Sequence, residues 1–169
     1  VTTVAGAWET LSFDLSAGAT GTYATVVIFP NGRSTVTADK TMYIDELQFP
    51  VAGGGGSGSG STGTCTGAAC VDFSEPGIGF GPFENQGGGT VEIANDPNDA
   101  ANKVVKFVKK PGDGEYFGTT ITGLGGSVVL TATEKTVTMR VYSPTVGTNF
   151  LLKLEGGPGG AVVEKDMVT

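Results

Sequence analysis

Short stretches in which apolar and polar residues alternate recur along this chain. The clearest is Lys135–Tyr142, where Val137, Met139 and Val141 fall on one face and polar side chains fall on the other. This period of two is typical of a strand with one buried face. The stretches are separated by sequences such as Pro111–Gly114, whose residues favour turns. The pattern therefore predicts many short strands and almost no helix.

The expected strands cover most of the chain outside one glycine-rich region. They span residues 71–73, 90–94, 103–108, 115–121, 135–142, 149–155, 161–169 running into Val1, 8–15, 23–29 and 41–49. The stretch from Ser74 to Pro82 is rich in glycine and proline and is expected to form turns. Strands at this spacing predict an all-β fold, an antiparallel β-sandwich of jelly-roll type.

A domain boundary is expected inside the chain rather than at its ends. The run Gly53–Ser61 contains only glycine and serine and cannot bury enough apolar surface to offset the entropy lost on ordering. The last residues followed by the first read as one piece of β-domain. We therefore expect one sandwich formed by residues 71–169 plus 1–51 in cyclic order, with 53–70 as a Gly/Ser-rich linker that carries a cysteine pair. A tandem array or an engineered circular permutant would each produce this order.

Charge and composition exclude several classes of function. The chain has 169 residues with 10 basic and 17 acidic side chains, a net charge of −7, which disfavours nucleic acid as a partner. No segment reaches the roughly 18 apolar residues that a membrane-spanning helix needs.

Histidine is absent, so serine–histidine and cysteine–histidine catalysis are excluded. Glutamates lie near expected strands or turns, but their spacing singles out no pair for glycoside hydrolysis. These glutamates are Glu46, Glu75, Glu115 and Glu155. We therefore expect a protein that is not an enzyme.

The two cysteines, Cys65 and Cys70, are separated by a glycine-containing turn sequence. This spacing favours a local disulfide, which would stiffen the junction between linker and first strand and would indicate an oxidising compartment. Two free thiols are the alternative. Without histidine or a second cysteine pair, a zinc site is disfavoured. The expected location is secreted or on the cell surface.

Several segments together resemble the jelly-roll modules, related to carbohydrate-binding modules, that accompany secreted bacterial glycoside hydrolases such as laminarinases. The segments are 71–73, 136–144, 150–155, 6–14 and 42–47. They cover the whole domain, in permuted order. The resemblance implies an extracellular β-sandwich more firmly than it implies binding to any particular sugar.

Candidate glycan-binding residues follow from the aromatic side chains, since sugar rings pack on aromatic faces. Tyr116 and Phe117 begin a strand after a turn, with Glu115 and Asp113 as possible acceptors for sugar hydroxyls. Trp8 is the single tryptophan; it either offers its ring to a sugar or packs as part of a strand, and we expect packing.

A structural calcium ion is suggested by analogy with related jelly rolls, in which an ion often ties the first strand to the last. Asp72 and Glu75 in the first segment and Asp45 and Glu46 in the last would supply oxygen ligands. The alternative is that these carboxylates are simply exposed in turns.

Two functions compete on this basis. In the first, favoured by the cyclic closure, the chain is a structural or adhesive building block of a tandem-repeat surface protein or filament. Neighbouring copies are then its partners, arranged head to tail and joined covalently or by strand donation. In the second, it is a carbohydrate-binding module that binds a β-glucan or related polysaccharide and tethers a secreted glycoside hydrolase.

Overall fold

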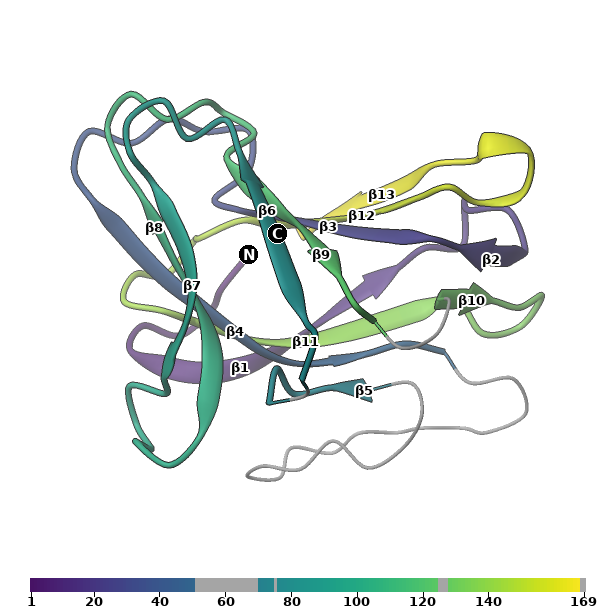
Figure 1. Cartoon of the computed structure of the whole chain (residues 1–169), viewed down its shortest axis with the longest axis horizontal. Helices are drawn as coiled ribbons and strands as arrows, with labels where there is room; N and C mark the ends of the chain where they lie inside the picture. Colours follow the sequence, from purple (N-terminus) through teal and green to yellow (C-terminus); the bar gives the residue numbers. More distant parts are fainter. Residues whose placement is uncertain (51–69, 75, 125–127, 168–169) are drawn as a thin grey trace.

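The computed structural model describes residues 1–50, 70–74, 76–124 and 128–167, and most of these residues lie in strands or in the turns between them. The elements in chain order are β1 (Ala7–Asp14), β2 (Gly21–Tyr23), β3 (Thr25–Pro30), β4 (Lys40–Gln48), β5 (Cys70–Val71), β6 (Gly79–Phe83), β7 (Thr90–Asn95), β8 (Lys103–Lys109), β9 (Gly118–Thr122), β10 (Val128–Leu130), β11 (Thr136–Ser143), β12 (Phe150–Glu155), the 3₁₀ turn η1 (Pro158–Gly160) and β13 (Val163–Asp166) (Figure 1).

Two antiparallel sheets pack face to face. The six-stranded sheet has the order β1-β11-β4-β8-β7, with β5 paired to the end of β4, and the five-stranded sheet has the order β13-β12-β3-β9-β6. A short ladder joins β10 and β2. The all-β antiparallel sandwich is confirmed, whereas the jelly-roll connectivity stays a prediction.

The core lies between the two sheets and follows the alternation in the sequence. In β11, Val137, Met139 and Val141 are fully buried, as the pattern predicts. In β3, Val26 and Ile28 belong to this main core, while Val27 and Phe29 belong to a second, smaller apolar cluster. Alternate residues of a strand point to opposite faces, so the five-stranded sheet also carries apolar side chains on its outer face.

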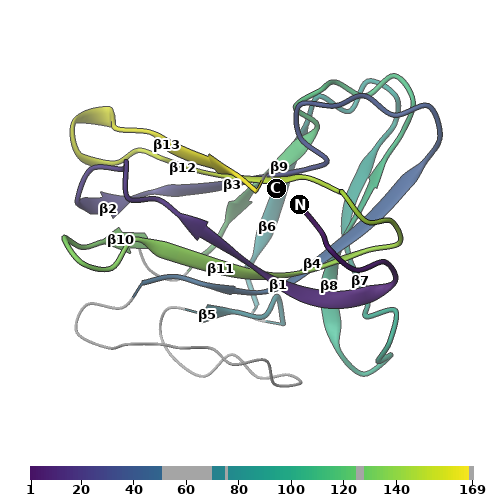
Figure 2. The ribbon, with the colours of Figure 1, turned by 180° about the vertical axis from the view of Figure 1, so that it is seen from behind.

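The two ends of the chain lie side by side, as the front and back views both show (Figures 1 and 2). The ammonium group of Val1 donates a hydrogen bond to the carbonyl of Met167. The amide of Thr2 donates to the carbonyl of Thr148 at 2.9 Å, and the amide of Met167 donates to the carbonyl of Phe150 at 2.9 Å. Both ends are therefore anchored near the connection between β11 and β12.

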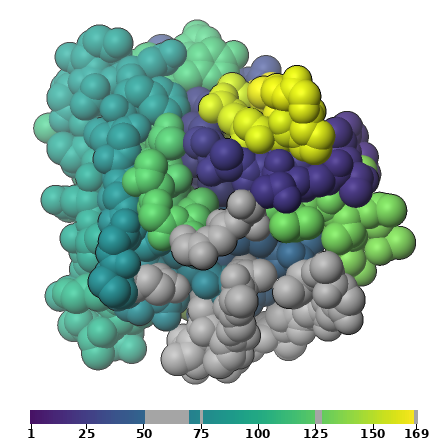
Figure 3. All heavy atoms as spheres, turned by 45° about the vertical axis from the view of Figure 1, so that its right-hand side comes forward, coloured from purple at the N-terminus to yellow at the C-terminus, as the bar shows by residue number. Residues whose placement is uncertain are grey.

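The ends do not form the single strand that the sequence suggested. β13 ends at Asp166 in the five-stranded sheet, and β1 begins at Ala7 in the six-stranded sheet. The expectation that the strand from residue 161 runs on into Val1 is wrong, because the chain changes sheets here. Figure 3 shows the C-terminal residues, in yellow, packed against purple residues from the N-terminal part of the chain.

The linker predicted for residues 53–70 lies almost entirely outside the described residues, as does Cys65. Cys70 begins β5, which pairs antiparallel with Leu47 and Gln48 of β4. The Cys65–Cys70 disulfide therefore stays a prediction. None of the described segments is a helix of the length and apolar character needed to cross a membrane.

Candidate functional site

An open groove of about 430 Å³ lies on the outer face of the five-stranded sheet. All five strands of the sheet and two loops contribute its walls and floor. It is lined by Val27 and Phe29 of β3, Phe83 of β6 and the following Glu84, Tyr116, Thr120 of β9, Lys153 and Glu155 of β12, and Glu164 of β13. We refer to these nine residues as the aromatic groove.

Three rings form the apolar part of the aromatic groove. The ring centroid of Phe29 lies 5.5 Å from that of Phe83 and 6.0 Å from that of Tyr116, both in edge-to-face contact. Phe29 is buried beneath the others, whereas Tyr116 is 40% exposed. Edge-to-face contacts of this kind stabilise aromatic clusters, so Tyr116 is held in place while part of it stays open to solvent.

Three carboxylates surround these rings, and each has a defined partner. Glu84 accepts a hydrogen bond from the amide of Tyr116 at 2.9 Å through Oε2. Oε1 of Glu155 lies 2.6 Å from the ammonium of Lys153. Oε1 of Glu164 lies 2.8 Å from the guanidinium of Arg33. The carboxylates are therefore held at the groove and not left to move freely in solvent.

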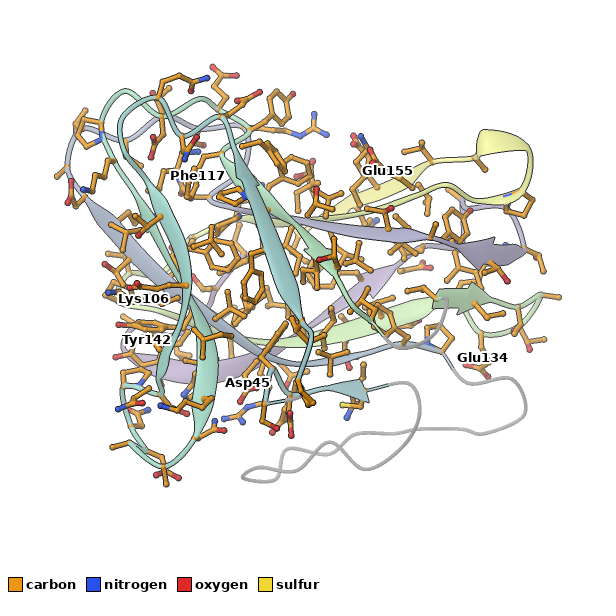
Figure 4. The ribbon with its side chains drawn as sticks, in the orientation of Figure 1. Asp45, Lys106, Phe117, Glu134, Tyr142 and Glu155 are labelled. Atoms are coloured by element: carbon orange, nitrogen blue, oxygen red, sulfur yellow. The ribbon has the colours of Figure 1, made fainter. Side chains whose placement is uncertain are left out.

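The structure separates the predicted glycan-binding residues into two groups. Tyr116 lines the groove and Glu115 is exposed beside it. Phe117 is fully buried in the core (Figure 4). Asp113 is also buried, and its carboxylate accepts hydrogen bonds from the amides of Gly87 at 2.8 Å and Lys110 at 2.7 Å. Phe117 and Asp113 therefore hold the loop together and cannot contact a ligand.

A buried lysine supports the loop that carries Tyr116. Lys109 is fully buried, and its ammonium donates to the carbonyls of Asn31 and Glu115, each at 3.2 Å. Burial lowers the pKa of Lys109, while the nearby carboxylates of Asp113, Glu84 and Glu115 act in the opposite direction. Because Glu115 precedes Tyr116, this ammonium fixes the backbone next to the exposed ring.

Trp8 lies on the outer face of the other sheet and is half-buried there. Its indole Nε1 donates to Oδ1 of Asp96 at 2.9 Å, and its ring centroid lies 5.7 Å from that of Tyr142. The guanidinium carbon of Arg140 sits 4.9 Å from the Trp8 ring centroid. The indole N–H and part of the ring are thus occupied by the protein, which agrees with packing as the role of Trp8.

The carboxylates expected at a calcium site have other partners. Asn102 Nδ2 donates to Asp45 Oδ2 at 2.9 Å, and Arg140 donates to Glu46 at 2.8 Å. Asp72 lies just beyond the short β4–β5 ladder and accepts hydrogen bonds from Ser74. Glu75 is outside the described residues. Within the described ranges no three His, Cys, Asp or Glu side chains are grouped as metal ligands would be, and calcium stays a prediction.

Asp45 itself is in an unusual electrostatic environment. It is 1% exposed, and this burial raises its pKa to about 6 against the opposing effects of its hydrogen bonds with Asn102 and Glu46 and of the Arg140 charge. Nearby Asp96 behaves differently. Burial acts to raise its pKa as well, but hydrogen bonds from Asn98, Trp8 and Asn102 outweigh burial and lower it.

Most of the groove was not identified from the sequence. One available signal was the run Thr25–Phe29, in which consecutive residues are apolar rather than alternating. Such a run indicates a strand covered on both faces, so Val27 and Phe29 had to lie under an apolar cluster on the outer face. Nothing in the local sequence places Glu84, Lys153 and Glu164 beside one another.

The fold and the groove define this chain as a β-sandwich with an aromatic and acidic cleft on one sheet. Comparisons with protein-family models, with curated proteins and with solved structures find no match. The resemblance to carbohydrate-binding modules therefore stays a prediction, and the functional argument depends on the geometry of the groove.

Proposed function

We propose that this chain is a non-catalytic β-sandwich module that binds a polysaccharide in the aromatic groove. The observation that carries the proposal is the exposed ring of Tyr116, fixed above Phe29 and flanked by carboxylates. Sugar rings offer apolar C–H faces that pack on aromatic rings, and their hydroxyls donate to carboxylates. An open groove suits a chain of sugars better than a single small ligand. A secreted or cell-surface location fits this role.

The contacts of the groove carboxylates favour binding over catalysis. Glycoside hydrolysis needs one carboxyl group that donates a proton and a second that acts as base or nucleophile. Glu155 and Glu164 are each already in an ion pair, with Lys153 and Arg33 respectively. These contacts hold both carboxylates in place as hydrogen-bond acceptors, and they assign neither one as an acid or a base.

Replacing Tyr116 with alanine should weaken polysaccharide binding at least tenfold. Truncating a central aromatic contact typically costs about 2 kcal/mol of binding free energy, which exceeds a tenfold change in Kd. Binding of soluble β-glucan and related oligosaccharides is measured by isothermal titration calorimetry. Tyr116→Phe keeps the ring and should bind nearly as tightly as the unmodified protein.

Tyr43→Ala provides the matched control for this experiment. Tyr43 is also a half-buried aromatic residue in edge-to-face contact, with Tyr142, but it belongs to the six-stranded sheet. Its removal should leave binding unchanged. Equal losses in both alanine variants, or no binding to any polysaccharide, would contradict the proposed site.

A second candidate function is a structural or adhesive repeat whose neighbouring copies follow one another head to tail. It is supported by the adjacency of the two chain ends, which are both anchored near the β11–β12 connection. A chain that continued from residue 169 into Val1 would leave the described strands in place. Glycan binding and a place in a repeat array are compatible with each other.

If copies are joined covalently, natural material that has been denatured and reduced should give masses near multiples of 17.0 kDa. Assembly by strand donation would instead give single copies from material that forms filaments before denaturation. Mass spectrometry paired with electron micrographs of the same sample separates the two. Single copies without filaments would rule out the repeat function.

A further inference from the structure

The charges around the aromatic groove are unbalanced. Its lining contains the three carboxylates of Glu84, Glu155 and Glu164 and one cationic side chain, Lys153. Arg33, next to the lining, pairs with Glu164 but is shared with Asp166, so carboxylates still outnumber cations here. The chain as a whole is acidic, with a net charge of −7. This field repels uronate-containing or sulfated polysaccharides and attracts a cationic ligand.

The rings of the groove act in the same direction as the carboxylates. The faces of aromatic rings attract a cation, and the interaction is strongest where the site is partly desolvated. The ring of Phe83 and the exposed ring of Tyr116 both line the groove and pack edge to face on the buried ring of Phe29. Aromatic faces combined with carboxylates are the chemistry that recognises an ammonium group.

The carboxylates can also accept further hydrogen bonds. The contacts of Glu84 use Oε2, and those of Glu155 and Glu164 use Oε1. Within the part of the chain that the structure describes, the second oxygen of each carboxylate is not used in these contacts. These oxygens are therefore acceptors for sugar hydroxyls and for an ammonium group.

Building on the proposed polysaccharide-binding function, we infer that the groove prefers a polymer of amino sugars with free amines over neutral or acidic polysaccharides. The ammonium groups of such a polymer meet the carboxylates, while its sugar rings pack on Tyr116. N-acetylation removes the positive charge but keeps the sugar ring. Comparing the acetylated polymer with the free amine therefore separates the contribution of the charge from that of ring packing on Tyr116.

The test compares three oligosaccharides of equal length: a glucosamine oligomer, its N-acetylated form and a neutral β-glucan. At a pH of about 6 the amines are protonated, and the glucosamine oligomer should bind about tenfold more tightly than either other ligand, because each partly exposed charge pair contributes up to about fivefold. Raising the salt from about 50 mM to about 500 mM should remove most of this preference by screening.

Two substitutions in the groove should shift the preference in opposite directions. Glu155→Gln should weaken binding of the glucosamine oligomer severalfold, and Lys153→Met should strengthen it, with little change for the neutral glucan. Because general damage to the fold weakens binding in every case, it cannot make one substitution weaken and the other strengthen binding of the glucosamine oligomer. Glu134→Gln is the matched charge control, since Glu134 is exposed in the β10–β11 turn, far from Glu155 (Figure 4).

The possible failures of the two proposals are distinguishable. Equal binding of all three oligosaccharides, unaffected by salt, overturns the amino-sugar preference and leaves the polysaccharide-binding function standing. Stronger binding of the N-acetylated oligomer or of the neutral β-glucan than of the glucosamine oligomer overturns the preference in the same way. No binding by any oligosaccharide overturns both proposals.

Discussion

Replacing Lys109 with alanine should lower the free energy of unfolding by about 4 kcal/mol. A large buried side chain truncated to alanine costs about 2–5 kcal/mol through lost packing and the resulting cavity. The buried carbonyl of Asn31 also loses the ammonium that donates to it, and an unsatisfied buried acceptor costs about 1–3 kcal/mol. The carbonyl of Glu115 keeps the hydrogen bond from the amide of Arg33 at 3.0 Å, so its loss costs less. Relaxation of the loop around the substituted residue reduces the total loss of stability from these two causes. Chemical denaturation measured by fluorescence checks the value.

Lys109→Met separates the two contributions, because methionine keeps most of the apolar stem and removes the charge. We expect a loss of about 2 kcal/mol, smaller than for alanine. The control is Lys165→Ala on exposed β13, where a change within about 0.5 kcal/mol is expected. If Lys109→Ala were as mild as this control, the ammonium would not be holding the loop. Binding to the groove offers a second readout, since loosening the backbone at Glu115 should also displace Tyr116.

The strands in which apolar and polar residues alternate clearly were predictable from the sequence. The strands that were missed have identifiable physical causes. The stretch Gly79–Phe83 contains two glycines and a proline and was expected to form turns, yet it forms β6. The strand is possible because β6 lies at the edge of its sheet and pairs only with β9, so Pro82 is not required to donate to a second neighbour. Edge position is a property of the topology and cannot be derived from five residues.

Lys109 shows a different limit. Continuing the alternation of β8 from Val105 and Phe107 by one step places Lys109 on the core face. The predicted strand ended at Val108. A lysine is rarely fully buried, so the local sequence does not indicate that Lys109 lies in the core. Burial is tolerated here because two backbone carbonyls converge on the ammonium, that of Glu115 in the following loop and that of Asn31, which is 78 residues away in the sequence. That convergence is tertiary, so only the structure reveals it.

The candidate site was predictable only in part for the same reason. Tyr116 follows a strong turn and was predicted, together with Phe117, as a candidate glycan-binding residue. Phe117, the next residue, had equal merit in the sequence but points into the core, since neighbouring residues of an extended chain face opposite sides. The remaining groove residues come from strands that are adjacent only after the sheet has formed.

The stability of the protein should fall by about 3 kcal/mol, through Asp45 alone, as the pH rises from about 3 to about 7. The pKa of Asp45 is about 6 in the folded state, above its ordinary value of 3.8. Between these two pKa values the folded state holds a proton that the unfolded state has released, so raising the pH favours unfolding. A pKa difference of about two units at about 1.4 kcal/mol each gives the stated size. Above about pH 7 the group is ionised in both states and this contribution is constant.

Asp45→Asn should abolish this part of the pH dependence, because asparagine can still accept the hydrogen bond from the amide of Glu46 and does not titrate. The difference in unfolding free energy between the two proteins, measured by denaturation from about pH 2.5 to about pH 7, isolates Asp45 from all other groups. Asp96→Asn is the control, because the contribution of Asp96 to the unfolding free energy depends on pH with the opposite sign. Its lowered pKa means that Asp96 contributes stability that is lost as the pH falls below about 4, the ordinary range for this group. A constant difference between the Asp45→Asn variant and the unmodified protein across this range would mean that Asp45 is ionised throughout, with the Arg140 charge and the Asn102 hydrogen bond outweighing burial.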